Sequence, residues 1–570
     1  MRFKKETGDL KLYAVAGTQT VLLAFDMTKA KAKGQFLGFE VSRVDAQGNK
    51  ISLNGSKHFK SLLDDATITD PKIKFASLIQ SFFWKDYLAD PGQKYTYTVK
   101  AMFGTAHGFA SKFENTIKVE TEVFDEGVHG VFFNYGVTGS QGYAKKGFGN
   151  KKVSDLSPAD YKKALDYLSR ELYNDGLMGF LADAKSAKRS LYCAFYEIQY
   201  MPFLKELKDV RAKCKNLEIV YSAQPDQNKD STDPVKGTGN TNSLKKAGLL
   251  SVSHPRTKAN QPHNKFMVLC EDEVPIEVWT GSTNITISGI FGQSNTGHRI
   301  RDKQLAAKYK KYWETLKDNP DLSDLSPVSM QIQPDTDLTK IKNGRYVFFS
   351  PRDLPIPKKT VPNQLNTYRN LIESASNLVC MIFPFNYDDV FKNVYDEQKD
   401  YLRLLIFEKM SEAKRAKSKA VSDPDLLVTA GAVLDSPVED WVKEVSPAAT
   451  VKGGIKYVHN KIFLIDPLSD DPVVVTGSAN FSQPSITSND ENTVVIKGDK
   501  RVADIYLTEF NRLFDHFWPR YLEKINKGKG KGFEKPLDET FTWADDYFVK
   551  DTFHQKRGQL FIKMSGAKKG

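Results

Sequence analysis

The sequence has few cysteines and no motif of the kind that holds a metal ion. Its four cysteines, Cys193, Cys214, Cys270 and Cys380, lie far apart and form no CxxC pair. A zinc cage needs closely spaced Cys or His ligands, and a disulfide scaffold needs many cysteines, so both are excluded. The sequence also lacks HExxH and carboxylates grouped at metal-ligand spacing. We therefore expect reduced thiols, no metal and no cofactor.

Long hydrophobic runs are missing as well. No window approaches the ~18 consecutive apolar residues that a transmembrane helix needs. The N-terminal sequence MRFKKETGDLKLYAVAG has no apolar core ahead of a small-residue cleavage site. We expect a cytoplasmic protein without a transmembrane segment. Export by a dedicated secretion system, which needs no N-terminal signal, stays an open alternative.

The residues that are present indicate a large folded chain. Of its 570 residues, 40% are hydrophobic and 27% are charged, so the chain can bury large cores. A typical domain of about 150 residues gives roughly three or four units. The 82 Lys and Arg residues exceed the 70 Asp and Glu residues by 12. This excess is a mild bias toward partners that carry phosphate.

Residues 1–128 are predicted to form an all-β sandwich. The sequence YTYTVKAMF at 95–103 alternates side chains after a turn signal at Asp90, Pro91 and Gly92, as a strand does after a turn. The pattern PGxxYxYxV resembles the late-strand signature of fibronectin type III domains. This resemblance implies an accessory or binding module without chemistry of its own.

From residue 129 onward the sequence repeats itself. The matching strand segments are 131–134 with 347–350, 191–195 with 378–382, and 217–222 with 402–407. Each copy then enters a polar stretch, 225–246 or 411–425, which we expect to be a loop. The first copy also carries a helix that starts with Ser157 as N-cap and Pro158 at the first helical position and runs to about Leu172.

The repetition divides the rest of the chain. We place the first repeat at 129–320, a linker rich in Asp, Ser and Pro at 321–344, the second repeat at 345–525, and a basic extension at 526–570. Lysine and glycine alternate at 527–532 and recur at 567–570, and we expect mobile loops or tails there.

Two copies of one motif carry the chemistry. HNK begins at His263 and again at His459, and a Gly-Ser-x-Asn turn begins 18 residues after each histidine. The motif residues are His263, Lys265, Ser282 and Asn284 in the first copy, and His459, Lys461, Ser478 and Asn480 in the second. Every pair is displaced by the same 196 residues. One HxK is expected by chance about once in such a chain, but the doubled register is a strong signal.

Strand geometry explains what these residues can do. In HxK the His and Lys side chains lie on one face of a strand, and the intervening asparagine, Asn264 or Asn460, points to the other. A Gly-Ser-x-Asn turn supplies a tight bend, a hydroxyl and an amide that could hold phosphate oxygens. Two facing copies suit a phosphodiester: one neutral histidine attacks phosphorus, and the other, protonated, donates to the leaving oxygen.

These motifs resemble those of the phospholipase D superfamily, whose members carry two His-x-Lys-x4-Asp motifs, each followed by Gly-Ser-x-Asn. The resemblance covers residues 129 to 520. It implies a bilobal α/β fold of two pseudo-symmetric repeats, with mixed sheets flanked by helices and the site at their interface. It also implies a covalent phosphohistidine intermediate, no required metal, and substrates that include phospholipids, DNA and RNA. Because one chain holds both motifs, a monomer could hold a complete site.

The second copy fits the superfamily pattern and the first departs from it. Asp466 completes the second motif and is expected to cap or orient a strand end, and Glu491 resembles the acidic residue that orients a catalytic histidine. Cys270 and Asn295 occupy the equivalent positions in the first copy. The missing carboxylate predicts that His263 is less basic than His459, and His298 is a candidate to compensate for it.

Three functions remain open. The first is a nuclease, which the net charge and the lysine-rich segments favour. The second is a phospholipase D or phosphatidyl transferase, in which apolar residues at 285–291 would enter an anionic membrane surface. The third is an inactive scaffold that binds phosphate. We favour nucleic acid as the substrate.

Overall fold

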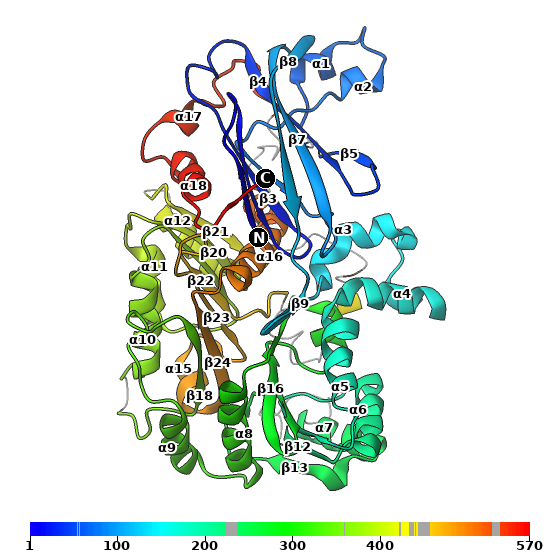
Figure 1. Ribbon diagram of the computed structural model, residues 1–570, viewed down its shortest axis with the longest axis vertical. Helices are drawn as coiled ribbons and strands as arrows, with labels where there is room; N and C mark the ends of the chain where they lie inside the picture. The colour runs from blue at the N-terminus through cyan, green and yellow to red at the C-terminus, as the bar shows by residue number, and fades with distance from the viewer. Residues whose placement is uncertain are drawn as a thin grey trace.

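The computed structural model shows an N-terminal β-sandwich followed by a bilobal α/β region (Figure 1). It describes all of the 570 residues except 54, 56, 224–235, 358–359, 421–422, 432–437, 439–440, 443–456 and 527–535. Among the helices of the described residues, none combines the length and the apolar composition that a membrane span requires.

Two sheets form the sandwich. The first contains β1 (Arg2–Lys5), β2 (Lys11–Ala16), β3 (Val21–Asp26), β6 (Phe83–Asp86) and, from the other end of the chain, β25 (Lys568–Lys569). The second contains β4 (Phe36–Val44), β5 (Lys50–Ser52), β7 (Lys94–Thr105) and β8 (Gly108–Glu120). Alternate residues of β7, namely Tyr95, Tyr97 and Val99, are buried in the core between the sheets. The predicted sandwich is confirmed, and the likeness to fibronectin type III domains stays a prediction.

The C-terminal extension returns to this sandwich. Its helices are α17 (Asp545–Phe548) and α18 (Phe553–Ile562). The ring of Trp543 lies 5.0 Å from that of Phe36 and its Nε1 donates to the Phe36 carbonyl at 3.0 Å. β25 pairs with β1, which brings the two termini together (Figure 1). The expectation of a mobile tail at 567–570 is therefore wrong, because these residues complete a sheet. The lysine-glycine run at 527–532 lies outside the described residues.

The first repeat is built on an eight-stranded mixed sheet. Its strands, in spatial order, are β13 (Ser253–Arg256), β12 (Asn216–Ser222), β11 (Arg189–Phe195), β15 (Lys265–Glu271), β16 (Val274–Gly281), β17 (Thr296–Ile300), β10 (His129–Phe133) and β9 (Asp125–Glu126). Its helices are α3 (Ser140–Tyr143), α4 (Pro158–Ser169), α5 (Gly179–Asp183), α6 (Met201–Lys213), α7 (Lys236–Ala247) and α8 (Lys303–Lys317).

The second repeat has the same strand order. Its sheet contains β21 (Leu426–Ala430), β20 (Leu402–Phe407), β19 (Leu378–Phe383), β22 (Ile462–Ile465), β23 (Val473–Gly477), β24 (Asn489–Lys497) and β18 (Gly344–Ser350). Its helices are α10 (Asn363–Glu373), α11 (Asn393–Asp396), α12 (Met410–Ala420), α15 (Gln483–Thr487) and α16 (Lys500–Asn526). In both repeats the strands matched by sequence, β11 with β19 and β12 with β20, occupy equivalent places. The predicted bilobal fold of two pseudo-symmetric repeats is confirmed.

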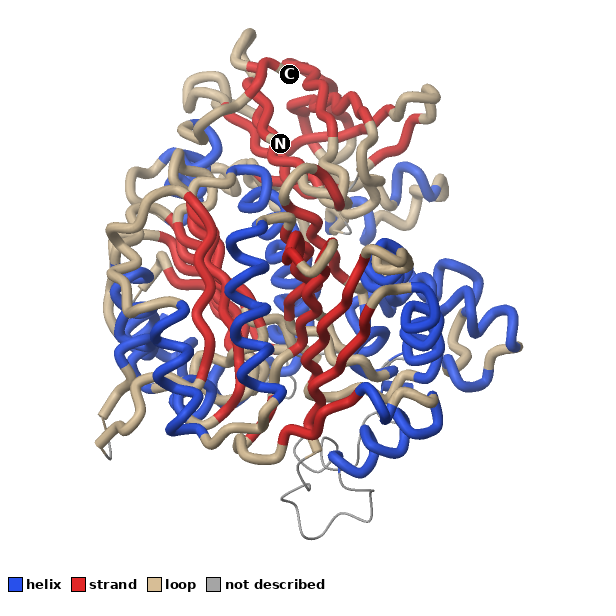
Figure 2. The backbone as a smooth tube through the Cα atoms, turned by 60° about the horizontal axis from the view of Figure 1, so that its bottom comes forward, coloured by secondary structure: helices blue, strands red, loops and turns tan. Residues whose placement is uncertain are grey.

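Helices α8 and α16 lie between the two sheets and join them into one core. Buried residues of both helices belong to a single hydrophobic cluster with strands of both repeats. Figure 2 shows helices between the two sheets and further helices on their outer faces. Because the sheets share this core, the site between them is held by both repeats.

Three expectations about local elements have mixed outcomes. α4 begins as predicted, with the Ser157 hydroxyl accepting from the amide of Asp160, but it ends at Ser169. Residues 236–246 and 411–420 of the two polar stretches belong to helices α7 and α12 rather than to loops. The predicted linker at 321–344 contains helix α9 (Leu322–Ile332), because its buried positions recur every three to four residues.

Candidate active site

Each HNK motif connects its own repeat to the other one. His263 follows the short strand β14 (Gln261–Pro262), which pairs with β24 of the second repeat. The amide of His263 donates to the carbonyl of Asp490 at 2.9 Å, and the amide of His459 donates to that of Ser294 at 3.1 Å. Backbone pairing therefore fixes each histidine against a segment of the opposite repeat.

The Gly-Ser turns close tightly against the neighbouring strands. Gly281 and Gly477 end β16 and β23 with φ of 147° and 150°, a backbone conformation that favours glycine. A Cβ atom at Gly281 would lie 2.2 Å from the carbonyl oxygen of Thr296, and one at Gly477 would lie 2.3 Å from that of Asn492. Only glycine fits at either position.

The two histidines are held by acceptors from opposite repeats. Nδ1 of His263 lies 2.8 Å from Oε2 of Glu491, and Nδ1 of His459 lies 2.8 Å from Oδ1 of Asn295. The expectation that His263 lacks a carboxylate is therefore wrong: the carboxylate lies behind His263, and the amide lies behind His459. The reason is that the histidine of each repeat packs against the other repeat, which supplies its acceptor.

The serine hydroxyls hold these acceptors in place. Ser478 donates to Oε2 of Glu491 at 2.7 Å, and Ser282 donates to Oδ1 of Asn295 at 2.8 Å. The expectation that they hold phosphate oxygens is not met, since each hydroxyl points to the acceptor behind a histidine. Burial raises the pKa of Glu491 to about 8, and the nearby Lys265 ammonium opposes that rise.

The lysines lie beside the histidines, each over an aromatic ring. Nζ of Lys265 donates to the carbonyl of His263 at 2.7 Å, and Nζ of Lys461 donates to that of His459 at 2.8 Å. Lys265 lies 5.1 Å from the ring centre of Tyr196, and Lys461 lies 4.9 Å from that of Phe385. Both lysines are almost completely buried, so their charges act through little water.

The asparagines follow the predicted alternation. Asn264 and Asn460 point away from the site. Asn264 accepts from the Asn492 side-chain amide at 3.0 Å, and Asn460 donates to the Thr296 hydroxyl at 2.7 Å. Asn284 and Asn480 instead line a cavity of about 370 Å³. Among the described residues, both have a buried Oδ1 atom without a hydrogen-bond partner.

That cavity brings the two motifs together. It is lined by residues of both repeats, including His263 and His459, and most of the lining is polar. Within the described part of the chain, no three His, Cys, Asp or Glu side chains form a group that could hold a metal ion. The arrangement places two imidazoles and two carboxamides around one space, with two ammonium groups close behind.

Comparison with known proteins identifies the family. The protein-family model described as "Cardiolipin synthase, PLD-like domain" matches residues 180–317 and 394–514, which contain both motifs. The part of the chain that carries both motifs belongs to the phospholipase D superfamily. A comparison with the curated proteins found no match.

Several solved structures are similar to part of this chain. Phosphatidylserine synthase from Haemophilus influenzae is 11% identical, with 61% of this chain and 85% of that chain covered and a TM-score of 0.41. Yeast tyrosyl-DNA phosphodiesterase is 12% identical, with 57% and 86% covered and a TM-score of 0.31. Nuc from Salmonella typhimurium is 17% identical, with 31% and 97% covered and a TM-score of 0.20.

The remaining positions of the superfamily motif lie away from the cavity. The carboxylate of Asp466 accepts from the amides of Ser376, Asn377 and Leu378 at 2.7 to 2.8 Å, so it orients the start of β19 as predicted. Cys270, its counterpart, is buried, and burial raises its thiol pKa to about 12. Cys270 therefore packs in the strand and cannot supply such an acceptor.

His298 does not compensate for the missing carboxylate. Its ring contacts His129 at 2.8 Å and the Tyr506 hydroxyl at 3.0 Å, and neither residue lines the cavity. Burial lowers the pKa of His298 well below its usual value. It belongs to a buried polar cluster of the core.

Sequence reasoning missed three residues of this superfamily site. Tyr196, Glu197 and Phe385 line the cavity, and the amide of Asn284 donates to the carboxylate of Glu197. The rings of Tyr196 and Phe385 lie 4.8 and 5.3 Å from those of His263 and His459. All three residues follow the matched strands β11 and β19, and this position was the available signal.

Proposed function

We propose that this protein is a phosphodiesterase that works through a covalent phosphohistidine and acts on nucleic acid. The observation that carries the proposal is the pair of histidines on one cavity, each with Nδ1 held by a buried acceptor. With Nδ1 engaged, Nε2 is the ring nitrogen that would react.

The proposed reaction has two steps. Nε2 of His263 attacks phosphorus, an N–P bond forms, the bond to the leaving oxygen breaks, and that oxygen takes a proton from His459. Water then gives a proton to the neutral His459 as its oxygen attacks phosphorus. The N–P bond breaks, and both histidines return to their starting states.

The choice of His263 as nucleophile follows from its acceptor. A carboxylate on Nδ1 makes an imidazole more basic, so Glu491 favours attack by His263. Asn295 is uncharged and fixes the orientation of His459 without strengthening its hold on a proton. His459 is thus the better proton donor.

Lys265, Lys461, Asn284 and Asn480 would stabilise the charge that develops on the phosphoryl oxygens. Lys265→Ala and Lys461→Ala should each lower kcat by about a hundredfold, with a smaller effect on binding. Ser282 and Ser478 would act through Asn295 and Glu491.

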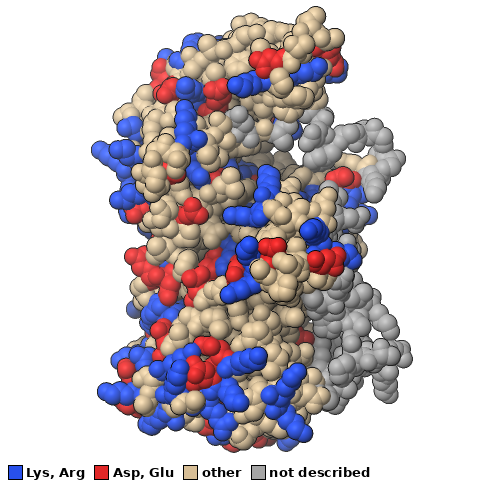
Figure 3. Space-filling view, turned by 90° about the vertical axis from the view of Figure 1, so that its right-hand side faces the viewer, with Lys and Arg blue, Asp and Glu red and all other residues tan. Residues whose placement is uncertain are grey.

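Support for nucleic acid comes from charge. Helices α6 and α7 pack side by side. Their exposed cations, with those that flank them, are Lys205, Lys208, Arg211, Lys213, Lys215, Lys245 and Lys246. On the face seen in Figure 3, Lys and Arg are interspersed with Asp and Glu and gather toward the lower end. An exposed basic surface on the repeat that holds His263 favours a polyanion, and binding there should weaken steeply with salt.

Phospholipid is the second candidate, and the description of the matching family model, a cardiolipin synthase, favours it. The apolar residues expected to enter a membrane do not support it, since Ile285, Ile290 and Phe291 are buried in the core. Both substrates offer the same phosphodiester, so the site chemistry alone does not distinguish them.

The test is cleavage of labelled single- and double-stranded DNA and RNA in excess EDTA. The His263→Ala and His459→Ala variants serve as matched controls. We expect cleavage that resists chelation and is lost in both variants. If no nucleic acid is cleaved and anionic phospholipid vesicles give product, the substrate is phospholipid. No activity on either substrate, with no effect of the variants, would indicate a scaffold.

A further inference from the structure

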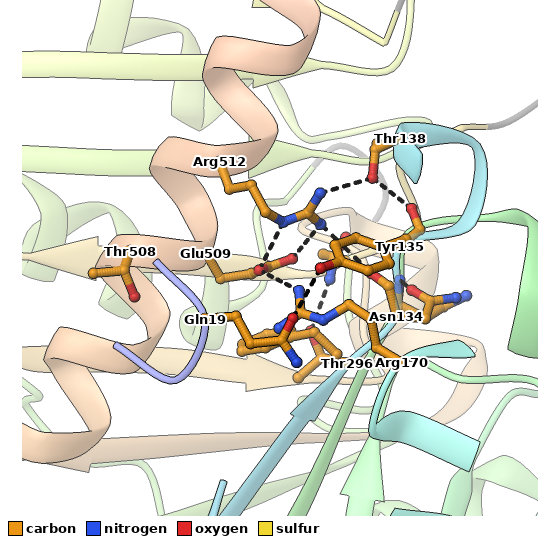
Figure 4. A network of polar contacts seen from close by, with 12 residues as sticks. Gln19, Asn134, Tyr135, Thr138, Arg170, Thr296, Thr508, Glu509 and Arg512 are labelled. Atoms are coloured by element: carbon orange, nitrogen blue, oxygen red, sulfur yellow. Dashed lines mark hydrogen bonds and ion pairs between the residues drawn. The ribbon is translucent and has the colours of Figure 1, made fainter. Parts of the chain in front are cut away.

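A buried hydrogen-bond network connects the N-terminal sandwich to the turn that holds His459. The network runs through the first repeat and α16, and Figure 4 shows its central residues. Asn134, which follows β10 and is completely buried, lies at the end of the network nearest the site.

Asn134 fixes the segment that carries Asn295. Its Nδ2 donates to the carbonyls of Ile290 and Gln293 at 2.8 and 2.7 Å. Its Oδ1 accepts from the amide of Asn295 at 2.8 Å. One side chain thus makes hydrogen bonds to three residues of the segment 290–295.

The same segment holds His459 in two ways. Oδ1 of Asn295 lies 2.8 Å from Nδ1 of His459. The amide of Ser294 donates to the carbonyl of Tyr457 at 2.9 Å, and the Ser294 carbonyl accepts from the amide of His459. A shift of this segment would therefore move both the ring and the backbone of His459.

Three buried ion pairs, formed by two arginines and two glutamates, lie at the start of this path. Arg170 binds Glu171 and Glu509, and Arg512 binds Glu509 and the Thr138 hydroxyl. The four charges balance. Burial alone would raise the pKa of Glu509, but Arg512 and Arg170 outweigh it and lower that pKa. Figure 4 shows Arg512 and Glu509 reaching from α16 toward Arg170 and Tyr135.

The sandwich contributes Gln19, at the tip of the hairpin between β2 and β3. Nε2 of Gln19 donates to Glu171 at 3.0 Å, and its Oε1 accepts from the Tyr135 hydroxyl at 2.9 Å. Glu171 in turn accepts from the amide of Phe133, next to Asn134. At Gly17 a Cβ atom would lie 1.9 Å from the Thr508 hydroxyl, so the hairpin fits closely against α16.

We propose that Asn134 is a positioning residue for His459, and that Gln19 supports it from the sandwich through the Arg–Glu cluster. The sandwich is thereby part of the catalytic unit rather than a detachable module. The proposal rests on the proposed function in one respect, the role of His459 as proton donor.

The test uses the leaving group. A sugar hydroxyl needs a proton from His459 to leave, whereas p-nitrophenolate does not. In single turnover, Asn134→Ala should slow cleavage of a dinucleotide by about tenfold to a hundredfold and cleavage of a p-nitrophenyl nucleotide diester by less than about twofold. Gln19→Ala should show the same selectivity with a smaller loss, and it keeps the test decisive if Asn134→Ala does not fold.

Asn511→Ala is the matched control. Asn511 is a buried asparagine on α16 whose side chain donates to the Leu507 carbonyl within the same helix. It should lower stability without a dependence on the leaving group. Equal losses on both substrates in Asn134→Ala and Gln19→Ala would overturn the proposal.

A second readout needs no activity. In imidazole ¹⁵N spectra, wild-type His459 should show a protonated Nδ1 and an unprotonated Nε2 when neutral. Asn134→Ala should mix the two tautomers of His459 and leave His263 unchanged. If the wild type cleaves no phosphodiester, the proposed function fails while this spectrum still decides the positioning. An unchanged His459 signal in Asn134→Ala would contradict the positioning role of Asn134.

Discussion

Two residues set the difference between the histidines at the centre of the molecule. Glu491 lies behind His263, and Asn295 lies behind His459, at the same distance of 2.8 Å. From this difference we expect the two rings to have opposite tendencies, with His263 the more basic and His459 the better acid.

Glu491→Gln should shift the acidic side of the pH profile. Burial raises the pKa of Glu491 to about 8, and the pair it forms with His263 must lose a proton before His263 can attack, so kcat/KM should rise with pH through that region. With an uncharged glutamine the midpoint should move down toward about 6.5, the ordinary value for histidine. The plateau should fall by about tenfold or more. A midpoint that stays in place would show that another group controls this limb.

Asn295→Asp should shift the alkaline side of the pH profile. A carboxylate beside Nδ1 favours the charged ring of His459, so the pH above which the proton donor is lost should rise by about one unit or more. The variant also loses the donor from Asn295 Nδ2 to the Gly289 carbonyl at 2.7 Å, which should lower the free energy of unfolding by about 1–3 kcal/mol. Profiles of kcat against pH and urea unfolding measure the two effects. An unchanged alkaline midpoint would argue against His459 as the acid.

Sequence reasoning predicted the motif residues but not their pairing. The constant displacement of 196 residues identified His263 and His459, whereas the contact between His263 and Glu491 joins residues 228 apart in different repeats. When each repeat is considered alone, the sequence pattern assigns Asn295 to His263 and Glu491 to His459. Only the packing of the two sheets on α8 and α16 reveals the exchange.

At the scale of the elements, strands were easier to predict than helices. β11, β12, β19 and β20 are short apolar runs, and their repetition along the chain identified them. α7, α9 and α12 are rich in polar residues, so composition suggested loops. What makes them helical is the burial of a narrow apolar face against the sheets, which composition does not express.

Asp466 should matter for stability and not for catalysis. Its carboxylate accepts from three consecutive amides at the start of β19. Asp466→Ala should therefore lower the free energy of unfolding by about 2 kcal/mol, with kcat unchanged. Asp470→Ala is the control, because that side chain is 83% exposed and its ion pair with Lys500 contributes little. A large loss of kcat in folded Asp466→Ala would place this residue in the active site after all.

At the scale of the whole molecule, the chain closes on itself. The buried side chain of Arg2 donates to Asp504 on α16 at 2.8 Å and to the carbonyl of Pro467 at 2.7 Å. It also donates to the carbonyl of Ser565 at 3.1 Å. The first strand, the second repeat and the C-terminal segment therefore meet at one guanidinium, a contact that a division into successive units did not suggest.

Arg2→Met should destabilise the whole chain. It leaves the buried Asp504 carboxylate without its guanidinium, which should lower the free energy of unfolding by about 3–5 kcal/mol. Lys4→Met, which removes only the half-exposed pair with Glu6, should change it by less than about 1 kcal/mol. Denaturant unfolding of the two variants checks this. Equal stabilities would mean that the Arg2 cluster does not hold these segments together.

The central claim is that His263 forms the bond to phosphorus while His459 moves the proton. The most direct measurement is mass spectrometry of the His459→Ala variant quenched after mixing with bis(p-nitrophenyl) phosphate. The p-nitrophenolate leaving group of this substrate needs no proton from an acid. The covalent adduct on the enzyme should persist in this variant, because His459 is not there to activate water. We predict a p-nitrophenyl phosphoryl group on the peptide that contains His263, and none in His263→Ala. An adduct in the reverse experiment, on His459 of the His263→Ala variant, would contradict the account.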